Sequence, residues 1–236
     1  MDMCSRLVFI LALIFTSYFS FAQEHRHTVP DYREIETLTK DRSSAFYYPE
    51  LFKRYAANDT ELTLRDYRLL YYGYFFQDNY TPFYRTPEAD SVRLLLGDKD
   101  HLTNEEWEEV IRLSHVNLRN NPFDLKGLNI VWVAHRHTGD SATARLYFDK
   151  LKKLVQTILS TGDGLSEATA FHILNVSHEY DIINILGYEY GGNQNLTDKK
   201  CDYLSLKVND DNLSGLYFDV NQIFEGYKKN MYTKEP

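Results

Sequence analysis

The hydrophobic periodicity of the chain changes near Gly162-Asp163-Gly164, and this change limits the fold more than any other feature of the sequence. Before it, apolar residues recur every three or four positions, as in helices that bury one face. After it, short runs alternate apolar and polar residues and are separated by segments rich in Gly, Asn and Asp, as in strands joined by turns. The sequence therefore predicts an α+β protein, a single domain over residues 31–236 with a helical part (31–161) and a strand-rich part (165–230).

The most aromatic helix follows Thr63, which has the capping-box spacing with Asp66. Its apolar positions recur at helical spacing and form one face, made of Tyr67, Leu70, Tyr71, Tyr74 and Phe75. An aromatic platform for a sugar or peptide would use such a face. We favour the simpler interpretation that these rings form core, because other sides of the same helix are also apolar.

The later helices have the rhythm of a helical repeat. An Asn121-Pro122 joint precedes a helix from Asp124 to His137, and a Gly139-Asp140 turn precedes a third helix that starts with small residues. This order is typical of tetratricopeptide repeats, although only one clear unit is present, preceded at most by a degenerate one. We expect a tetratricopeptide-like helical layer.

The strand-rich part predicts a small antiparallel sheet with a closing helix. The alternating runs are residues 169–176, 202–208 and 215–220, with turns expected at 191–195 and 209–215. The helix is expected over residues 221–230.

The first 22 residues have the pattern of a secretory signal peptide. Arg6 precedes an apolar run over residues 7–15, and the small residues of Ser20-Phe21-Ala22 fit a cleavage site. The run is shorter than the ~20 residues of a spanning helix, so we expect no membrane span after cleavage. The mature protein would be periplasmic or extracellular, with a flexible N-terminus over residues 23–30.

Charge and cysteine content exclude some classes of protein. The formal net charge is −8, and an acidic chain without a basic run repels phosphate backbones, which argues against a nucleic-acid partner. Cys201 is the only cysteine after the expected cleavage site, so no intrachain disulfide can form. It lies in a strand-like run, where we expect it to be buried.

The best enzymatic candidates lie in residues 171–190, where His178, Glu179 and Asp181 stand among apolar neighbours. The simpler interpretation places the two acids in the first turn of a helix, where the helix dipole favours negative charge. His172 is six residues before His178, which is about 20 Å along a strand or ~9 Å along a helix, so we expect no shared metal ion. No short catalytic or cofactor-binding motif is present, and we expect no cofactor.

Several motifs together resemble one known family. They are ELTLRDYRLLYYGYFFQDNYTPF, NPFDLKGLNIVWVAHRHTGD, HEYDIINILGY, DYLSL and GLYFDV. The chain is similar, over roughly residues 40 to 230, to the domain-of-unknown-function family 4919. The resemblance implies an exported bacterial protein with a helical first part and a short strand-rich end, and it implies no activity or catalytic residue.

Two hypotheses of function follow. The first is a non-enzymatic module of the bacterial envelope that binds a protein or peptide partner, because repeat-like helices commonly form concave binding surfaces. The second is a hydrolase or small-ligand-binding protein with a tyrosine-lined cleft at the helix–sheet junction, which would use His178, Glu179 or Asp181.

Overall fold

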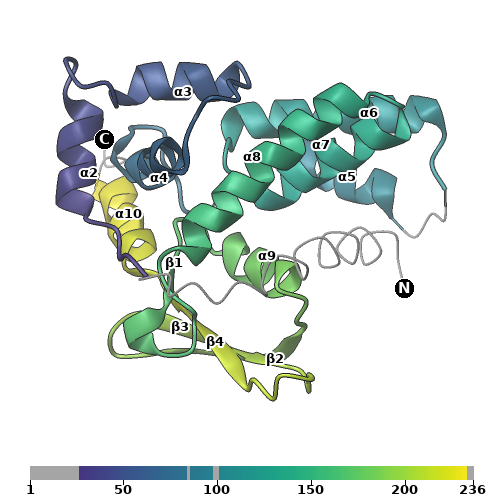
Figure 1. Ribbon diagram of the computed structural model, residues 1–236. Helices are drawn as coiled ribbons and strands as arrows, with labels where there is room; N and C mark the ends of the chain where they lie inside the picture. The colour runs from purple at the N-terminus through teal and green to yellow at the C-terminus, as the bar shows by residue number, and fades with distance from the viewer. Residues whose placement is uncertain (1–26, 84–85, 98–100, 233–236) are drawn as a thin grey trace. The chain divides into compact units, whose positions relative to one another are not determined.

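The computed structural model describes residues 27–83, 86–97 and 101–232 (Figure 1). The expected signal peptide therefore lies outside the described residues. Of the expected flexible N-terminus only the last four residues are described, and there the Thr28 amide donates a hydrogen bond of 2.9 Å to the Ser160 carbonyl.

Within these residues the protein is α+β, with nine α-helices and a four-stranded sheet. The described residues form two compact units. Unit 1 contains residues 86–97, 101–152 and 181–187, and unit 2 contains residues 27–83, 153–180 and 188–232. No helix in the described ranges combines the length and apolarity needed to cross a membrane.

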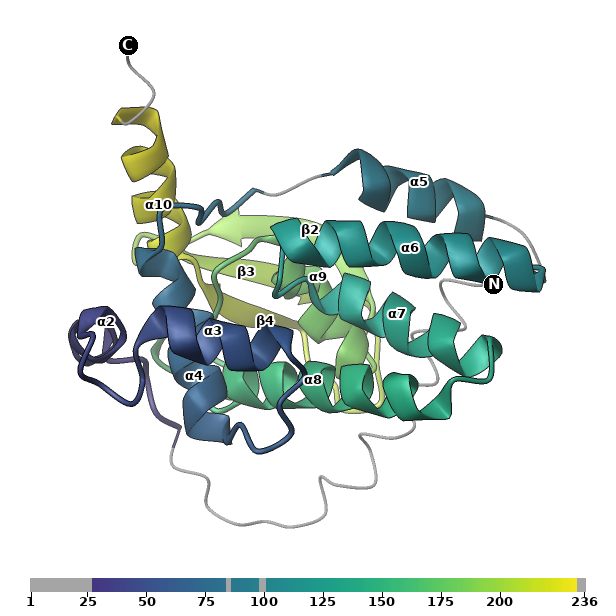
Figure 2. The same cartoon turned by 90° about the horizontal axis from the view of Figure 1, so that it is seen from above.

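Unit 1 is helical. It contains α5 (Pro87–Leu96), α6 (Asn104–Asn120), α7 (Leu125–His137), the first part of α8 (Ser141–Leu159) and the last part of α9 (Ser177–Ile185). Helix α6 packs against both α5 and α7 (Figure 2). The Thr103 hydroxyl and the Glu106 carboxylate form the predicted capping box at the start of α6.

The first helices of unit 2 pack around a helix that is rich in aromatic residues. These are α2 (Tyr32–Lys40), α3 (Tyr48–Ala56) and α4 (Leu64–Gly73), which continues into the short 3₁₀ helix η2 (Tyr74–Phe76). Helix α4 contacts both α2 and α3. Of the predicted face, four residues are at most 6 % exposed, whereas Phe75 in η2 is half-buried; the four are Tyr67, Leu70, Tyr71 and Tyr74.

The sheet of unit 2 has the order β1-β4-β3-β2. Its strands are β1 (Phe171–His172), β2 (Tyr190–Leu196), β3 (Cys201–Leu206) and β4 (Gly215–Asp219). Strands β2 and β4 each pair antiparallel with β3, whereas β1 pairs parallel with β4. The closing helix α10 (Asn221–Tyr232) follows β4, as predicted.

Three details of the predicted sheet are wrong. The sheet is mixed rather than antiparallel, because Phe171 and His172 run parallel to Phe218 and Asp219. The expected strand over residues 169–176 is only two residues long, because the 3₁₀ helix η3 (Glu167–Thr169) precedes it and the chain soon enters α9.

The third correction concerns residues 191–195, which form most of β2 rather than a turn. Gly and Asn disfavour strands, but pairing with a neighbouring strand can override that preference. The β2–β3 register shifts between Tyr190 and Gln194, and Gly192 in this irregular part has a φ of +96°. A glycine adopts that conformation without strain, so the weak strand propensity of the segment reflects a bulge and not a turn.

The two faces of the sheet differ in composition. One face carries buried apolar residues, Leu204 and Leu216 in one cross-strand pair and Phe218 opposite Asp202. The other face carries Tyr203 and Tyr217, whose ring centroids lie 4.9 Å apart. Cys201 is 2 % exposed, so its predicted burial is confirmed. Burial raises the pKa of this thiol to about 11, which keeps it in the unreactive form.

Candidate functional site

Helix α9 presents the predicted candidates. It begins at Ser177, whose amide donates a hydrogen bond of 2.9 Å to the Asn175 side chain. After its last residue, Gly187 ends it with a φ of +86°, as predicted. His178 and Glu179 belong to unit 2, and Asp181 belongs to unit 1.

His178 is held by a buried tyrosine. The Tyr71 hydroxyl lies 2.7 Å from its Nδ1 atom and accepts a hydrogen bond of 3.0 Å from the Leu174 amide. One tyrosine oxygen thus contacts both the imidazole of α9 and the backbone just before that helix. His178 is 2 % exposed, and this contact ties α9 to the aromatic helix α4.

Glu179 is the most unusual titratable group in the predicted stretch. It is 0 % exposed, and its Oε1 atom has no hydrogen-bond partner within the described residues. Burial is the main cause that raises the pKa of this carboxyl to about 9, and the nearby Asp202 carboxyl is the second cause. Glu179 is therefore protonated at neutral pH.

A glutamine from β2 links Glu179 to Asp202. The Gln194 Nε2 atom donates to Asp202 Oδ2 at 2.8 Å and, more weakly, to Glu179 Oε2 at 3.4 Å. The Tyr180 hydroxyl donates to Gln194 Oε1 at 3.0 Å and orients the amide. We call Glu179 and Asp202 the carboxyl pair.

The register of the strands explains how the carboxyl pair forms. Gln194 lies opposite Leu204, two residues from Asp202 on β3, so both polar side chains are on the face of the sheet that carries Leu204. Tyr190 reaches the same face, and its ring meets the Tyr180 ring edge-on at 5.4 Å. Two tyrosines thus flank the pair.

The carboxyl pair can perform acid–base chemistry in principle. Two neighbouring carboxyl groups that share a site keep one proton between them, and the more buried group holds it. Glu179 is a proton donor at neutral pH, while the half-buried Asp202 is the member with access to solvent. A basic side chain from a partner would be attracted to the same pair.

Asp181 has different neighbours. Burial raises its pKa to about 8, and the charge of Asp124 in the same unit adds to the shift. Its Oδ2 atom is buried and has no hydrogen-bond partner in the part of the chain that is described. Residues two apart on a helix point in different directions, so Asp181 does not join the carboxyl pair.

Sequence reasoning missed Asp202 and Gln194. The sequence predicts Asp202 in a strand, but only the pairing with β2 and β4 shows which face of the sheet it is on. It predicts Gln194 in a turn. The usable signal was the alternation of Asp202 with Leu204 and Leu206, which puts a carboxyl on an otherwise apolar face.

The described ranges contain no group of three or more His, Cys, Asp or Glu side chains arranged to hold a metal ion. The neighbours of the carboxyl pair are an amide and two tyrosines.

Comparison with known proteins identifies a family but no characterised relative. A family model described as "Domain of unknown function (DUF4919)" matches residues 33–229, which include α9 and the whole sheet. The resemblance inferred from the sequence motifs is confirmed. No curated protein and no solved structure matches the chain.

Proposed function

The chain belongs to the family described as domain of unknown function (DUF4919), and we propose that it is an exported, non-enzymatic module that binds an extended peptide segment of a partner protein. The observation that supports this proposal is the position of β2 at the outside of the sheet. Six of its seven residues are exposed. An outer strand offers unpaired backbone groups to a second chain.

The register indicates which groups face the partner. The Thr197 amide donates to the Cys201 carbonyl at 2.9 Å, and bonded and non-bonded pairs alternate from there along the ladder. Asn195 and Tyr203 therefore form a hydrogen-bonded pair of the ladder. The backbone N–H and C=O groups of Gln194 and Leu196 then point away from β3. No strand of the described residues pairs with that side of β2.

The sequence of β2 does not protect this edge. Natural edge strands commonly carry Lys or Pro, which block the addition of another strand. The segment YGGNQNL contains neither, and its irregular register ends at Gln194. Residues 194–196 therefore form a short regular template, and the partner adds to it as an additional strand.

The carboxyl pair favours a partner peptide that carries a basic side chain. Side chains of an added strand alternate between the two faces of the sheet, so every second one lies on the face of Asp202. A Lys or Arg at such a position would meet a carboxyl group of a chain whose net charge is −8. We therefore propose an extended peptide with a basic residue opposite Gln194.

The location of the protein belongs to the same proposal. The signal-like pattern of residues 1–22 supports export to the periplasm or beyond. A tetratricopeptide-like relation between α6, α7 and α8 is also proposed, on the Asn-Pro and Gly-Asp pattern of the sequence. A peptide on those helices is the alternative position for the partner, and a variant of β2 distinguishes the two.

We expect the substitution Leu196→Pro to abolish partner binding. Proline removes the amide that points away from β3 and leaves the bonded pair of Asn195 and Tyr203 in place. The measurement is a cross-linked pull-down from envelope and culture fractions with the tagged chain starting at Gln23. Amide hydrogen exchange then tests whether a recovered partner protects Gln194 and Leu196.

A matched control is Val208→Pro, which places the same residue at a fully exposed loop position outside the strands. Both variants should keep the circular dichroism spectrum of the parent protein. Partner recovery by Leu196→Pro at the level of the parent would contradict strand addition at β2. Loss of binding after removal of residues 105–161, with Leu196→Pro still active, would place the partner on the helices.

A hydrolase or small-ligand function at the carboxyl pair is the second candidate. The observation that favours it is the protonated carboxyl of Glu179 beside Asp202, between Tyr180 and Tyr190, with an Oε1 atom that has no hydrogen-bond partner among the described residues. A hydrolase would lose activity on ester or glycoside substrates in the variant Glu179→Gln, which lacks the ionisable proton. A binding module would show no such activity in either protein.

A further inference from the structure

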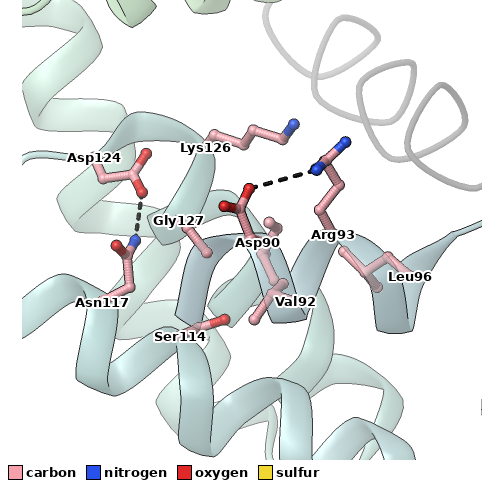
Figure 3. A pocket seen from close by; sticks show the side chains of 11 residues that line it. Asp90, Val92, Arg93, Leu96, Ser114, Asn117, Asp124, Lys126 and Gly127 are labelled. Carbon is pink, nitrogen blue, oxygen red and sulfur yellow. Dashed lines mark hydrogen bonds and ion pairs between the residues drawn. The ribbon is translucent and has the colours of Figure 1, made fainter. Parts of the chain in front are cut away.

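Unit 1 contains a cavity of about 170 Å³ between α5, α6 and the first turns of α7 (Figure 3). Its apolar wall is formed by Val92 and Leu96 of α5 and Ile130 of α7. Its polar wall is formed by α6 and the start of α7, through Ser114, Asn117, Asp124 and Lys126. Helix α5 also contributes the charged side chains of Asp90 and Arg93, so the cavity has an apolar part and charged groups on two of its sides.

A network of hydrogen bonds fixes the polar wall. The Asn117 amide accepts from the Thr86 hydroxyl at 2.8 Å and donates to Asp124 Oδ2 at 2.6 Å. Gly127 allows the carboxylate to lie against α7, because a Cβ atom there would approach Asp124 Oδ2 to 2.6 Å. Burial raises the pKa of Asp124, so this carboxyl gains from a cation placed beside it.

Ser114 is a second observation that points to a polar ligand in the cavity. The residue is 2 % exposed and lines the cavity. Its hydroxyl can both donate and accept a hydrogen bond at the wall of the cavity, so it suits a polar group of a ligand.

Two basic side chains and two carboxyl groups line the cavity. Lys126 is exposed where it borders the cavity, two residues from Asp124. Arg93 lines the cavity from α5 and lies 3.5 Å from Asp90. A ligand with a single charge would use only one of these groups, whereas a zwitterion would use both signs.

We propose that the cavity binds a small zwitterion with the head group of an α-amino acid and an aliphatic side chain. The ammonium group lies against Asp124, the carboxylate against Lys126, and the aliphatic part against Val92 and Leu96. A cavity of ~150 Å³ holds a ring of six carbon atoms, so the volume suits a ligand of about six to nine non-hydrogen atoms. This site is in unit 1 and does not depend on the peptide proposal for β2.

Isothermal titration calorimetry with the full chain from Gln23 tests the proposal, with L-valine and L-leucine as probes. Isobutylamine and isovalerate carry the two halves of the head group separately. We expect either amino acid to bind about tenfold or more tightly than each half, because two charge-assisted contacts form together.

Two variants test the assigned walls. Lys126→Gln removes the carboxylate contact at an exposed position and should weaken amino-acid binding about tenfold. Ala89→Leu fills the cavity from α5 and should abolish binding. Arg145→Gln, at an exposed position of α8 that does not line the cavity, is the matched control and should bind as the parent does.

The proposal is overturned by three results. The first is the absence of heat with both amino acids at ~10 mM, a concentration at which even millimolar affinities are seen, in a protein that keeps its circular dichroism spectrum; the cavity then holds water only. The second is equal affinity for an amino acid and its amine. The third is binding that survives both Lys126→Gln and Ala89→Leu.

Discussion

The variant Glu179→Gln is expected to be more stable than the parent protein, by an amount that grows from about pH 5 to about pH 9. The folded-state pKa of Glu179 is raised to about 9 because the carboxyl is buried. The unfolded chain releases this proton near its ordinary pKa of ~4.3. Between the two values the folded state binds one more proton than the unfolded state, so the free energy of unfolding falls as pH rises.

The effect is large for a single side chain. One unbalanced proton changes the free energy of unfolding by up to ~1.4 kcal/mol per pH unit. Glutamine has nearly the same shape as a protonated glutamate and does not titrate, so it removes this slope. Urea unfolding of both proteins at several pH values measures this slope, as the difference between their free energies of unfolding at each pH.

Glu189→Gln is the matched control, because Glu189 is exposed and its ion pair with Lys207 is at the surface. Such pairs contribute ~0–1 kcal/mol, so this variant should follow the parent at every pH. Parallel stability curves for Glu179→Gln and the parent would mean that Glu179 titrates normally. The carboxyl pair would then contain no group with a raised pKa.

The same variant connects stability to function. A buried carboxyl that weakens the fold at neutral pH is a local conflict, and such conflicts are expected at functional positions. If Glu179→Gln is stabilised but loses its peptide partner, the carboxyl pair belongs to the binding surface. If it is stabilised and binds normally, the pair only shapes the core under β2.

Local patterns were sufficient for the helices. The capping boxes of Thr63 and Thr103 and the stop at Gly187 depend on neighbours along the chain, and all three are confirmed. The burial of the α4 tyrosines follows from their helical spacing. These features need no information about distant residues.

The sheet and its carboxyl pair depend on long-range pairing. Strand β2 forms from a Gly- and Asn-rich segment because β3 pairs with it, and β1 is short because only two residues meet β4. Asp202 and Gln194 come together only through that register. Glu179 could be singled out from the sequence as an acid in a helical first turn, but its neighbours and its raised pKa could not.

We expect the variant Tyr71→Phe to be strongly destabilised. The Tyr71 hydroxyl serves two buried groups, the His178 ring at 2.7 Å and the Leu174 amide at 3.0 Å. Removing it takes a partner from each, and an unsatisfied buried group costs ~1–3 kcal/mol. The loss in the free energy of unfolding should be about 2–4 kcal/mol, which lowers the melting temperature by roughly 5–12 °C for a chain of this size.

Tyr217→Phe is the control, because this tyrosine is half-buried on the open face of the sheet, where its ring packs against Tyr203. The same atom is removed there, and we expect a change within ~0.5 kcal/mol, as for other surface substitutions. Equal losses in the two variants would show that the hydroxyl network does not hold α9 to α4. A selective loss in Tyr71→Phe would mean that the position of Glu179, one residue from His178, is set by this buried tyrosine and therefore by the aromatic helix that the sequence already marked as core.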